Sequence, residues 1–240
     1  MQVVLLRVGI DSGCGGMQGP LFRDGTFEYV PIPDEFRGTG VGSLTYGTAR
    51  GRHGKALVIY FPAKRRHKYL NKPIHFDPEF KTFTYGDPTP PKARLRTLQP
   101  GDLLVFYAGL ERWPEGGQRG LYIIGFFNVL MAGRAIDFTR SELTKHFGNN
   151  FHVRHDKVLK RQRNELVLVK GGAGSRLLRE ALLISTRGRD KRGRPLHILS
   201  PYMRKIFGDF QGHVSIQRSP PRWVDPSFIK RAVDFVSSLC

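Results

Sequence analysis

The sequence predicts an α+β fold in which a curved or barrel-like mixed β-sheet carries a few flanking helices and a C-terminal helix. Short runs of β-branched and aromatic residues, separated by turns rich in Gly and Pro, fill the N-terminal part of the chain. Two long apolar strand candidates follow in the middle of the sequence. Helical periodicity is concentrated in the C-terminal half.

The predicted strands fall into an N-terminal group and a middle pair. The N-terminal candidates are Val3–Val8, Phe27–Ile32 and Ala56–Phe61. The middle pair comprises residues 103–110 (LLVFYAGL) and 121–130 (LYIIGFFNVL), which the polar loop Glu111–Gly120 joins. Long apolar strands connected by a Gly-rich loop favour an antiparallel pair in a barrel or strongly curved sheet, with Gly125 at a bend.

Two helices are predicted in the C-terminal half. Leucines at helical spacing within Ser175–Leu183 indicate the first. The second begins at Asp225, a good N-cap, with Pro226 at the first helical position. Apolar residues at Ile229, Ala232, Val233, Val236 and Leu239 then share one face. We therefore expect a C-terminal helix docked on the core.

Length and composition favour one domain over residues 1–240, with the proline-rich segment 87–92 as a candidate boundary between 1–90 and 93–240. The apolar runs are too short to span a bilayer, and no secretory signal is evident. Two cysteines, Cys14 and Cys240, cannot form a disulfide framework, which favours a cytoplasmic location. No CxxC or HxxxH pair is present, so no metal site is predicted.

The charge of the chain indicates a polyanionic partner. Lys and Arg number 39 against 20 Asp and Glu, a formal net charge of +19. Cationic side chains placed near phosphates release counterions from nucleic acid, so nucleic acid is the expected partner. Arg154–Arg194 holds thirteen Lys or Arg against four Asp or Glu and predicts a basic face. An anionic membrane is the weaker alternative, because the predicted C-terminal helix has few basic residues on its polar face.

The Gly-rich turn after the first strand, residues 9–16, is the first candidate site. Its glycines allow a ligand to approach the backbone, notably at Gly13, and Asp11 would present a carboxylate at the strand end. It matches neither a dinucleotide-binding nor a Walker motif. The alternative is a plain loop in which Asp11 caps a turn.

A second Gly-rich segment, residues 170–176, lies between a predicted strand and the predicted leucine-rich helix. A helix N-terminus with free N–H groups binds anions, and Lys170, Ser175 and Arg176 would add two charges and a hydroxyl for a phosphate. The alternative is structural, since Gly and Ser are common where a helix follows a strand. Either way, no Walker motif is present and an NTPase is disfavoured.

Two histidine-containing segments complete the polar candidates. His152 and Arg154 lie at the start of the basic stretch and suit a phosphate contact, and His152 or His155 could also act as a general base. In residues 74–80 (IHFDPEF), alternation would place His75, Asp77 and Glu79 on one side of an extended segment. Those side chains form either an acid/base pair or the polar face of an edge strand.

Aromatic residues concentrate in the middle strand pair and its loop. Most of them must belong to the core, but Tyr107 and Trp113 are candidates for stacking on a base. Such a pocket would hold a base that has left the helical stack.

The order of the sequence blocks resembles the nucleotide modification associated domain family, type three. The blocks are VVLLRVGIDSGCGGMQGPLF, FEYVPIP, HFDPEFKTFTYGD, GDLLVFYAGL and LVLVKGGAGSRLLREALLIS. The resemblance implies a context of DNA base hypermodification, so DNA is expected rather than RNA. It implies roles for these positions: Asp11, Gly13, Glu28, Asp77, Tyr107, Lys170, Ser175 and Arg176. Residues 100–110 and 120–130 also resemble the strand pair of PUA-like barrels such as the EVE and YTH domains, which bind nucleic acid.

We therefore expect a protein of a base or nucleotide modification system that binds a nucleic acid backbone through a basic face and a base in a pocket. As an enzyme it would use Asp11, Asp77 and Glu28 as catalytic carboxylates. The alternatives are a non-catalytic reader of modified bases and a base-excising glycosylase or nuclease. The cofactor is left open, and other proteins of the pathway are further candidate partners.

Overall fold

The structure is a computed structural model that describes residues 1–34, 44–190, 192–217 and 220–239, so Lys191 and Cys240 lie outside the described residues. The strands are β1 (Val3–Arg7), β2 (Gly19–Leu21), β3 (Ile32–Pro33), β4 (Ile74–His75), β5 (Thr84–Asp87), β6 (Leu103–Arg112), β7 (Arg119–Arg134), β8 (Val167–Gly171), β9 (Arg176–Leu183), β10 (Ser185–Arg189), β11 (Pro195–Leu199) and β12 (Arg222–Trp223). The α-helices are α1 (Ala63–Tyr69), α2 (Arg140–Phe147), α3 (Phe151–Arg154), α4 (Asp156–Gln162), α5 (Pro201–Phe207) and α6 (Ile229–Ser237). The 3-10 helices are η1 (Leu57–Tyr60), η2 (Pro90–Thr97), η3 (Ala135–Asp137) and η4 (Pro226–Phe228).

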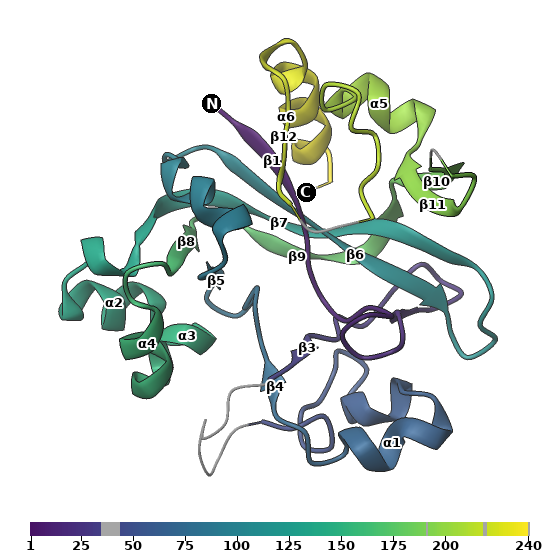
Figure 1. Ribbon diagram of the computed structural model, residues 1–240, viewed down its shortest axis with the longest axis horizontal. Helices are drawn as coiled ribbons and strands as arrows, with labels where there is room; N and C mark the ends of the chain where they lie inside the picture. The colour runs from purple at the N-terminus through teal and green to yellow at the C-terminus, as the bar shows by residue number, and fades with distance from the viewer. Residues whose placement is uncertain (35–43, 191, 218–219, 240) are drawn as a thin grey trace.

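An eight-stranded mixed sheet forms the centre of the molecule (Figure 1). Its strand order is β12-β1-β6-β7-β8-β5, with β2 added beside β6 and β9 beside β7. β1 runs parallel to β6, whereas β6, β7 and β8 are antiparallel neighbours. The α+β class is confirmed. The barrel-like form is not, because the described strands do not close: β9 pairs with the first part of β7 and β8 with the second, so the sheet divides along β7.

The predicted middle hairpin is present as β6 and β7. Its register shifts between Phe106 and Tyr107, opposite Gly125 and Ile123, so a bulge lies where the bend was predicted. Gly125 also faces β9: a Cβ atom there would lie 2.6 Å from the carbonyl oxygen of Arg176. The glycine therefore permits two strands to pack against β7 at its irregular point.

Replacing this glycine tests that close approach. Gly125→Ala is expected to lower the free energy of unfolding by about 1–3 kcal/mol, the usual cost of overpacking, because the added methyl would also lie 2.9 Å from the Phe80 ring. Urea denaturation monitored by circular dichroism measures the change. A variant as stable as the wild type would show that β9 can move away from β7 at no cost.

Three predicted elements differ in the structure. Ser175–Leu183 is not a helix: residues 176–183 form β9 and hydrogen-bond with β7, so tertiary pairing overrides the helical spacing of the leucines. Ala56–Phe61 is not a strand: residues 57–60 form η1, a single 3-10 turn that packs apolar side chains without a partner strand. Within Phe27–Ile32, only Ile32 belongs to a named strand.

The predicted C-terminal helix is confirmed. The Asp225 side chain accepts a hydrogen bond from the Ser227 backbone N–H, and η4 continues directly into α6. Ala232 and Val236 of α6 are buried in the cluster that covers one face of the sheet. Val3 and Leu5 of β1 point into this cluster, and their neighbours point into a second cluster on the opposite face.

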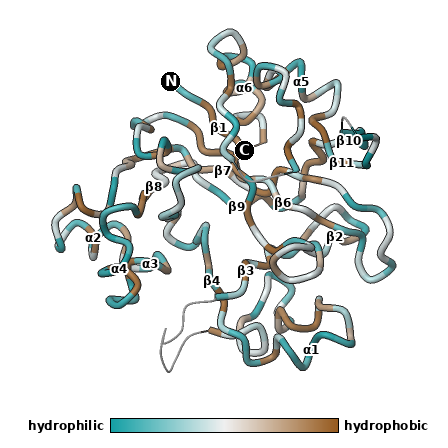
Figure 2. The backbone as a smooth tube through the Cα atoms, in the orientation of Figure 1, coloured by the Kyte–Doolittle hydropathy of each residue, from teal (hydrophilic) through white to brown (hydrophobic). Residues whose placement is uncertain are grey.

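Hydrophobic residues follow the central strands, most clearly along β1, whereas the outer end of the β10–β11 hairpin is hydrophilic (Figure 2). Strands from both sides of residues 87–92 lie in the same sheet, since β1, β2 and β5 pair with β6 and β8. Among the described residues, no helix has the length and apolar character needed to cross a membrane.

Candidate functional site

A cleft of about 570 Å³ lies where β1, β4, β5 and α3 approach one another. This volume falls in the range of small-molecule sites. Most of its chemistry comes from three segments that are far apart in sequence. The cleft is lined by Arg7, Val8, Gly9, Asp11, Gly13, Cys14, Ile32, His75, Asp77, Tyr85, Gly86, Asp87, Pro88, Thr89, Lys92, His152 and Gln217.

Two imidazoles and a carboxylate meet in one wall of this cleft. The Nε2 atoms of His75 and His152 are 3.1 Å apart. Asp77 Oδ2 lies 3.8 Å from Nε2 of His75 and 3.4 Å from Nε2 of His152. All three side chains are largely buried, with exposed fractions of 12%, 5% and 2% for His75, Asp77 and His152. They form the histidine–aspartate cluster, a set of groups that can exchange protons or hold a metal ion.

Backbone contacts hold His75 and Asp77 in place. β4 pairs with β3, where His75 lies opposite Ile32. Both carboxylate oxygens of Asp77 accept the backbone N–H of Gly86, each at 2.9 Å. The Tyr29 hydroxyl donates to the Asp77 carbonyl oxygen at 2.9 Å. The carboxylate is therefore oriented by the edge of β5 instead of swinging freely in the cleft.

His152 is fixed by its own helical turn. Asn150 caps α3, and its side-chain oxygen accepts the backbone N–H of His152 at 3.0 Å. On the imidazole, Nδ1 lies 2.7 Å from Oε1 of Gln162, which belongs to α4. An amide oxygen only accepts, so Nδ1 carries a proton and donates it to Gln162, and Nε2 is the ring nitrogen that faces the cluster.

Asp11 lies in the same cleft but is turned toward its own loop. Oδ1 accepts the backbone N–H groups of Gly13 at 2.7 Å and Cys14 at 2.9 Å, and Oδ2 lies 3.2 Å from the Arg7 guanidinium. Partial burial acts to raise the pKa of Asp11, but the Cys14 hydrogen bond and the Arg7 charge outweigh it and lower that pKa. The carboxylate is ionised at neutral pH, which suits a base or a cation contact better than a proton donor.

Cys14 also lines the cleft, as a thiol. Burial, helped by the neighbouring charge of Asp11, raises the pKa of Cys14 to about 11. The thiolate is the reactive form, so we expect Cys14 to alkylate about 100-fold more slowly than an unshifted thiol of pKa 9.0. Peptide mass spectrometry after iodoacetamide treatment at pH 7.5 measures the rate, and Cys14→Ser identifies the signal. Fast alkylation would contradict this placement.

Two cations lie at the edge of the cleft, each next to a carboxylate. Lys92 Nζ is 3.3 Å from Asp87 Oδ2, and the side chains of Lys92 and Arg7 are only 13% and 12% exposed. An anionic ligand could form an ion pair with Arg7 or Lys92 in place of Asp11 or Asp87. The cleft thus combines carboxylates, imidazoles and cations in one polar surface.

The structure brings four of the predicted site residues together: Asp11, Gly13, Asp77 and His152 line the cleft. His75 joins them, and its placement beside Asp77 agrees with the alternation of residues 74–80. Glu79 does not, because its carboxylate bonds the backbone N–H and the hydroxyl of Thr82 in the following turn. β4 ends at His75 and the chain bends at Pro78, so the alternation does not continue to Glu79.

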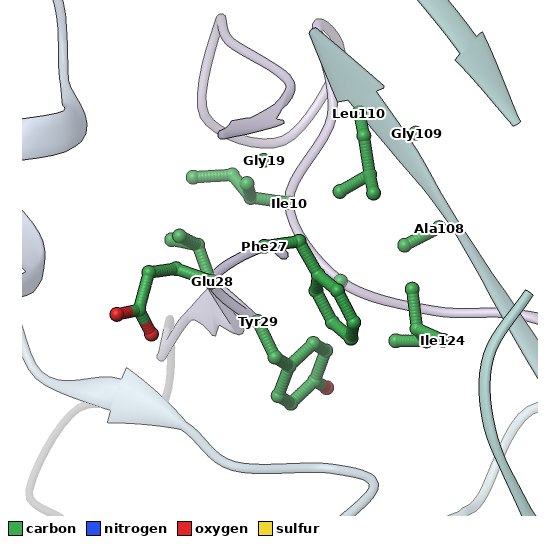
Figure 3. Close-up of a pocket in the computed structure, with 11 residues that line it drawn as sticks. Ile10, Gly19, Phe27, Glu28, Tyr29, Ala108, Gly109, Leu110 and Ile124 are labelled. Carbon is green, nitrogen blue, oxygen red and sulfur yellow. The ribbon is translucent and has the colours of Figure 1, made fainter. Parts of the chain in front are cut away.

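Glu28 lies outside the cleft. It is 1% exposed, and its carboxylate accepts the backbone N–H groups of Arg52 at 2.7 Å and His53 at 2.8 Å. Nδ1 of His53 and the Tyr60 hydroxyl also contact Oε1, at 2.8 and 3.3 Å. The apolar side chains of Ile10, Phe27 and Leu110 surround a gap that is too narrow for a water molecule. Figure 3 shows the Glu28 carboxylate directed away from these side chains. Its contacts are those of a structural group.

The second Gly-rich segment is the turn between β8 and β9, not a helix N-terminus. The reason for expecting an anion there is therefore lost. Ser175 is buried, and its hydroxyl accepts the backbone N–H of Asn128 at 3.0 Å. The Lys170 ammonium donates to the Thr82 carbonyl, and burial lowers the pKa of Lys170. Arg176 Nε lies 3.5 Å from the Gly174 carbonyl oxygen.

The two aromatic candidates do not line the cleft. Tyr107 is fully buried in the core of the sheet, and its hydroxyl donates to the Ile216 carbonyl at 2.9 Å. Trp113 packs edge-on against Phe22 and Tyr60 in a separate cluster. The aromatic side chain that does line the cleft is Tyr85, which sequence reasoning did not single out.

The basic stretch Arg154–Arg194 does not form one continuous face. Its first part is α3 and α4, where Arg154 is exposed, and its last part is the β10–β11 hairpin. These two parts lie at opposite ends of the molecule in Figure 1. The chain crosses the sheet between them through β8 and β9, so charge that is contiguous in sequence is divided in space.

Sequence reasoning missed Arg7, Lys92 and Gln162. Arg7 ends β1 four residues before Asp11, and that spacing was a usable signal. Lys92 is the last residue of the proline-rich segment 87–92, for which the sequence predicts a boundary and not a binding residue. Gln162 contacts His152 only because α3 and α4 fold against each other, and no local sequence pattern predicts that contact.

An open mixed sheet and a polar cleft of about 570 Å³ place this chain in the class of α+β proteins. A model of the nucleotide modification associated domain 3 family matches residues 2–237, so the chain belongs to that family and is associated with nucleotide modification systems. The family resemblance seen in the sequence is thereby confirmed. Searches of curated proteins and of solved structures found no match. The likeness to PUA-like barrels is not confirmed.

Proposed function

We propose that this protein is a cytoplasmic enzyme that modifies a base or nucleotide held in the cleft. Its substrate would be nucleic acid, with DNA preferred to RNA. One observation carries the proposal: Asp77 and His152, which are distant in sequence, meet at 3.4 Å in a cleft that Asp11 also lines. A carboxylate and an imidazole within hydrogen-bond reach of a ligand are the usual groups for general acid–base catalysis.

Each group has a role that follows from its contacts. Nε2 of His152, which faces His75 and Asp77, would take a proton from a ligand that reaches the cluster, and Asp77 would stabilise the imidazolium that forms. Asp11, ionised and bonded to Arg7, would orient the ligand or balance its charge. Gly13 would let the ligand approach the backbone of this loop.

Binding of the polymer is assigned to cations in two places. Arg7 and Lys92 would contact a phosphate at the cleft, where each now faces a carboxylate. The net charge of +19 would attract the rest of the nucleic acid, with Arg154, Lys170 and Arg176 as candidate backbone contacts outside the cleft. Ser175 is the weaker candidate, because its hydroxyl is buried.

Nucleoside mass spectrometry tests the proposal directly. DNA and RNA from cells with and without the gene are digested and compared, and the gene is then restored. A modified nucleoside that disappears on deletion and returns on restoration supports an enzyme of a modification pathway. An unchanged profile in both polymers would contradict it. The same experiment shows which polymer and which base are involved.

The two alternatives make different predictions. A reader of modified bases would leave the nucleoside profile unchanged and bind modified oligonucleotides selectively, but neither Tyr107 nor Trp113 faces the cleft. A glycosylase or nuclease would also use Asp77 and His152, and it would release a free base or cut the strand. Incubating the protein with oligonucleotides and resolving the products separates cleavage from modification.

A further inference from the structure

We propose that His75, Asp77 and His152 bind one divalent transition-metal ion through both Nε2 atoms and Asp77 Oδ2. Metal–ligand bonds of about 2.0–2.2 Å place ligand atoms that share one ion about 3.0–3.5 Å apart. The observed separations are 3.1, 3.4 and 3.8 Å. Two of the three pairs already have the spacing of a metal site, and the third needs an adjustment of a few tenths of an ångström.

The side chains and backbone groups that contact the three ligands orient them, as the partners of metal ligands do in known metal sites. His152 donates Nδ1–H to Gln162, which fixes the tautomer with Nε2 free to coordinate. Asp77 has both carboxylate oxygens on the Gly86 N–H, and Oδ2 still faces the two imidazoles. The His75 ring packs against Phe151 at an interplanar angle of 33°, with 4.0 Å between ring centroids, which limits its rotation. Contacts from α4, β5 and α3 therefore hold His152, Asp77 and His75 in place.

Burial of the cluster gives a second, independent reason. A carboxylate that is 5% exposed is costly unless a cation compensates its charge. Arg7 and Lys92, the cations that line the cleft, face Asp11 and Asp87. The Asp77 carboxylate is held by the Gly86 N–H and faces the two imidazoles, so a divalent ion between the three ligand atoms would place positive charge directly beside it.

The ligand set indicates the class of ion. Imidazole nitrogen favours Zn²⁺, Fe²⁺ and their neighbours over Mg²⁺ and Ca²⁺, which prefer oxygen ligands. Three protein ligands leave coordination positions open, as in catalytic and not in structural sites. Those positions would face the cleft, where a ligand or water could occupy them.

A metal titration of the whole protein tests the site. The protein is stripped with a chelator and titrated with Zn²⁺ in air and with Fe²⁺ under anaerobic conditions, and bound metal is counted by mass spectrometry. We expect one ion per chain, and a melting temperature about 5–10 °C higher at a metal concentration 100-fold above Kd. Tighter binding of Zn²⁺ or of Fe²⁺ assigns the ion, whereas equal binding of Mg²⁺ would overturn the proposal.

Variants show whether the ion lies at the cluster. His75→Ala should weaken binding by more than about 100-fold, and Gln162→Leu, which removes the partner of His152, by about 10–100-fold. His67→Ala, which alters an exposed histidine of α1, should change nothing. If His75→Ala does not fold, Asp77→Asn replaces it. The proposal would be overturned if the folded wild-type protein bound no metal ion. It would also be overturned if Gln162→Leu and His75→Ala (or Asp77→Asn in its place) bound the ion as tightly as the wild type. No nucleic acid enters this titration, so metal binding is measured separately from the test of the proposed function. An ion bound to Nε2 of His152 would take up the lone pair assigned above to proton transfer, and the cluster would then act on a ligand through the ion.

Discussion

Asp77→Asn is expected to reduce nucleoside modification by at least about 100-fold, the lower bound usual for loss of a general acid–base group. The change removes the negative charge beside His75 and His152 and keeps the size of the side chain. The amide oxygen can still accept the Gly86 N–H, so the edge of β5 should remain in place. Restoring the deleted gene with this variant and measuring nucleosides by mass spectrometry gives the activity.

A matched control separates this effect from general damage. Asp209→Asn removes the same charge at an exposed position outside the cleft and should leave modification unchanged. Circular dichroism must show that Asp77→Asn is folded. Modification at the wild-type level by a folded Asp77→Asn protein would remove Asp77 from the mechanism. Loss in both variants would point instead to an effect of net charge.

The sequence was sufficient where one local pattern has one physical solution. The C-terminal helix is an example, because a capping aspartate, a proline and a single apolar face agree with one another. The β6–β7 hairpin is another, since two long apolar runs around a Gly-rich loop have few alternatives. In both, the residues that decide the structure are neighbours in the chain.

Prediction failed where a partner distant in sequence decides the conformation. The leucines of residues 176–183 suit a helix, yet the same residues hydrogen-bond to β7. The strand is favoured because Gly125 leaves room for the Arg176 carbonyl oxygen. The correct element therefore depends on a glycine about fifty residues earlier, which no window of local periodicity includes.

The candidate site, too, could be predicted from the sequence only in part. His75 and Asp77 are close in sequence, and alternation placed them on one side. His152 is 77 residues from His75, and only the packing of α3 against β4 and β5 makes them neighbours. The absence of CxxC and HxxxH pairs excludes only a metal site whose ligands lie close together in the sequence. A site assembled from two segments gives no such spacing.

Glu28→Ala is expected to lower the free energy of unfolding by about 3–5 kcal/mol, since removing a buried carboxylate leaves its donors unsatisfied. Two backbone N–H groups, of Arg52 and His53, would lose their acceptor. Gly51 approaches so closely that a Cβ atom there would lie 2.4 Å from Glu28 Oε2, so this turn is built around the carboxylate. Urea denaturation measures the loss.

Variants of Glu28 also test whether its carboxylate is structural or catalytic. Glu165→Ala, at an exposed position, should stay within about 0.5 kcal/mol of the wild type. Glu28→Gln keeps an oxygen for one of the two N–H groups and should cost less than Glu28→Ala. At a low temperature, where Glu28→Gln is folded, it should retain nucleoside modification while Asp77→Asn does not. A folded Glu28→Gln protein without activity would return Glu28 to the catalytic group, because its loss could then not be explained by unfolding.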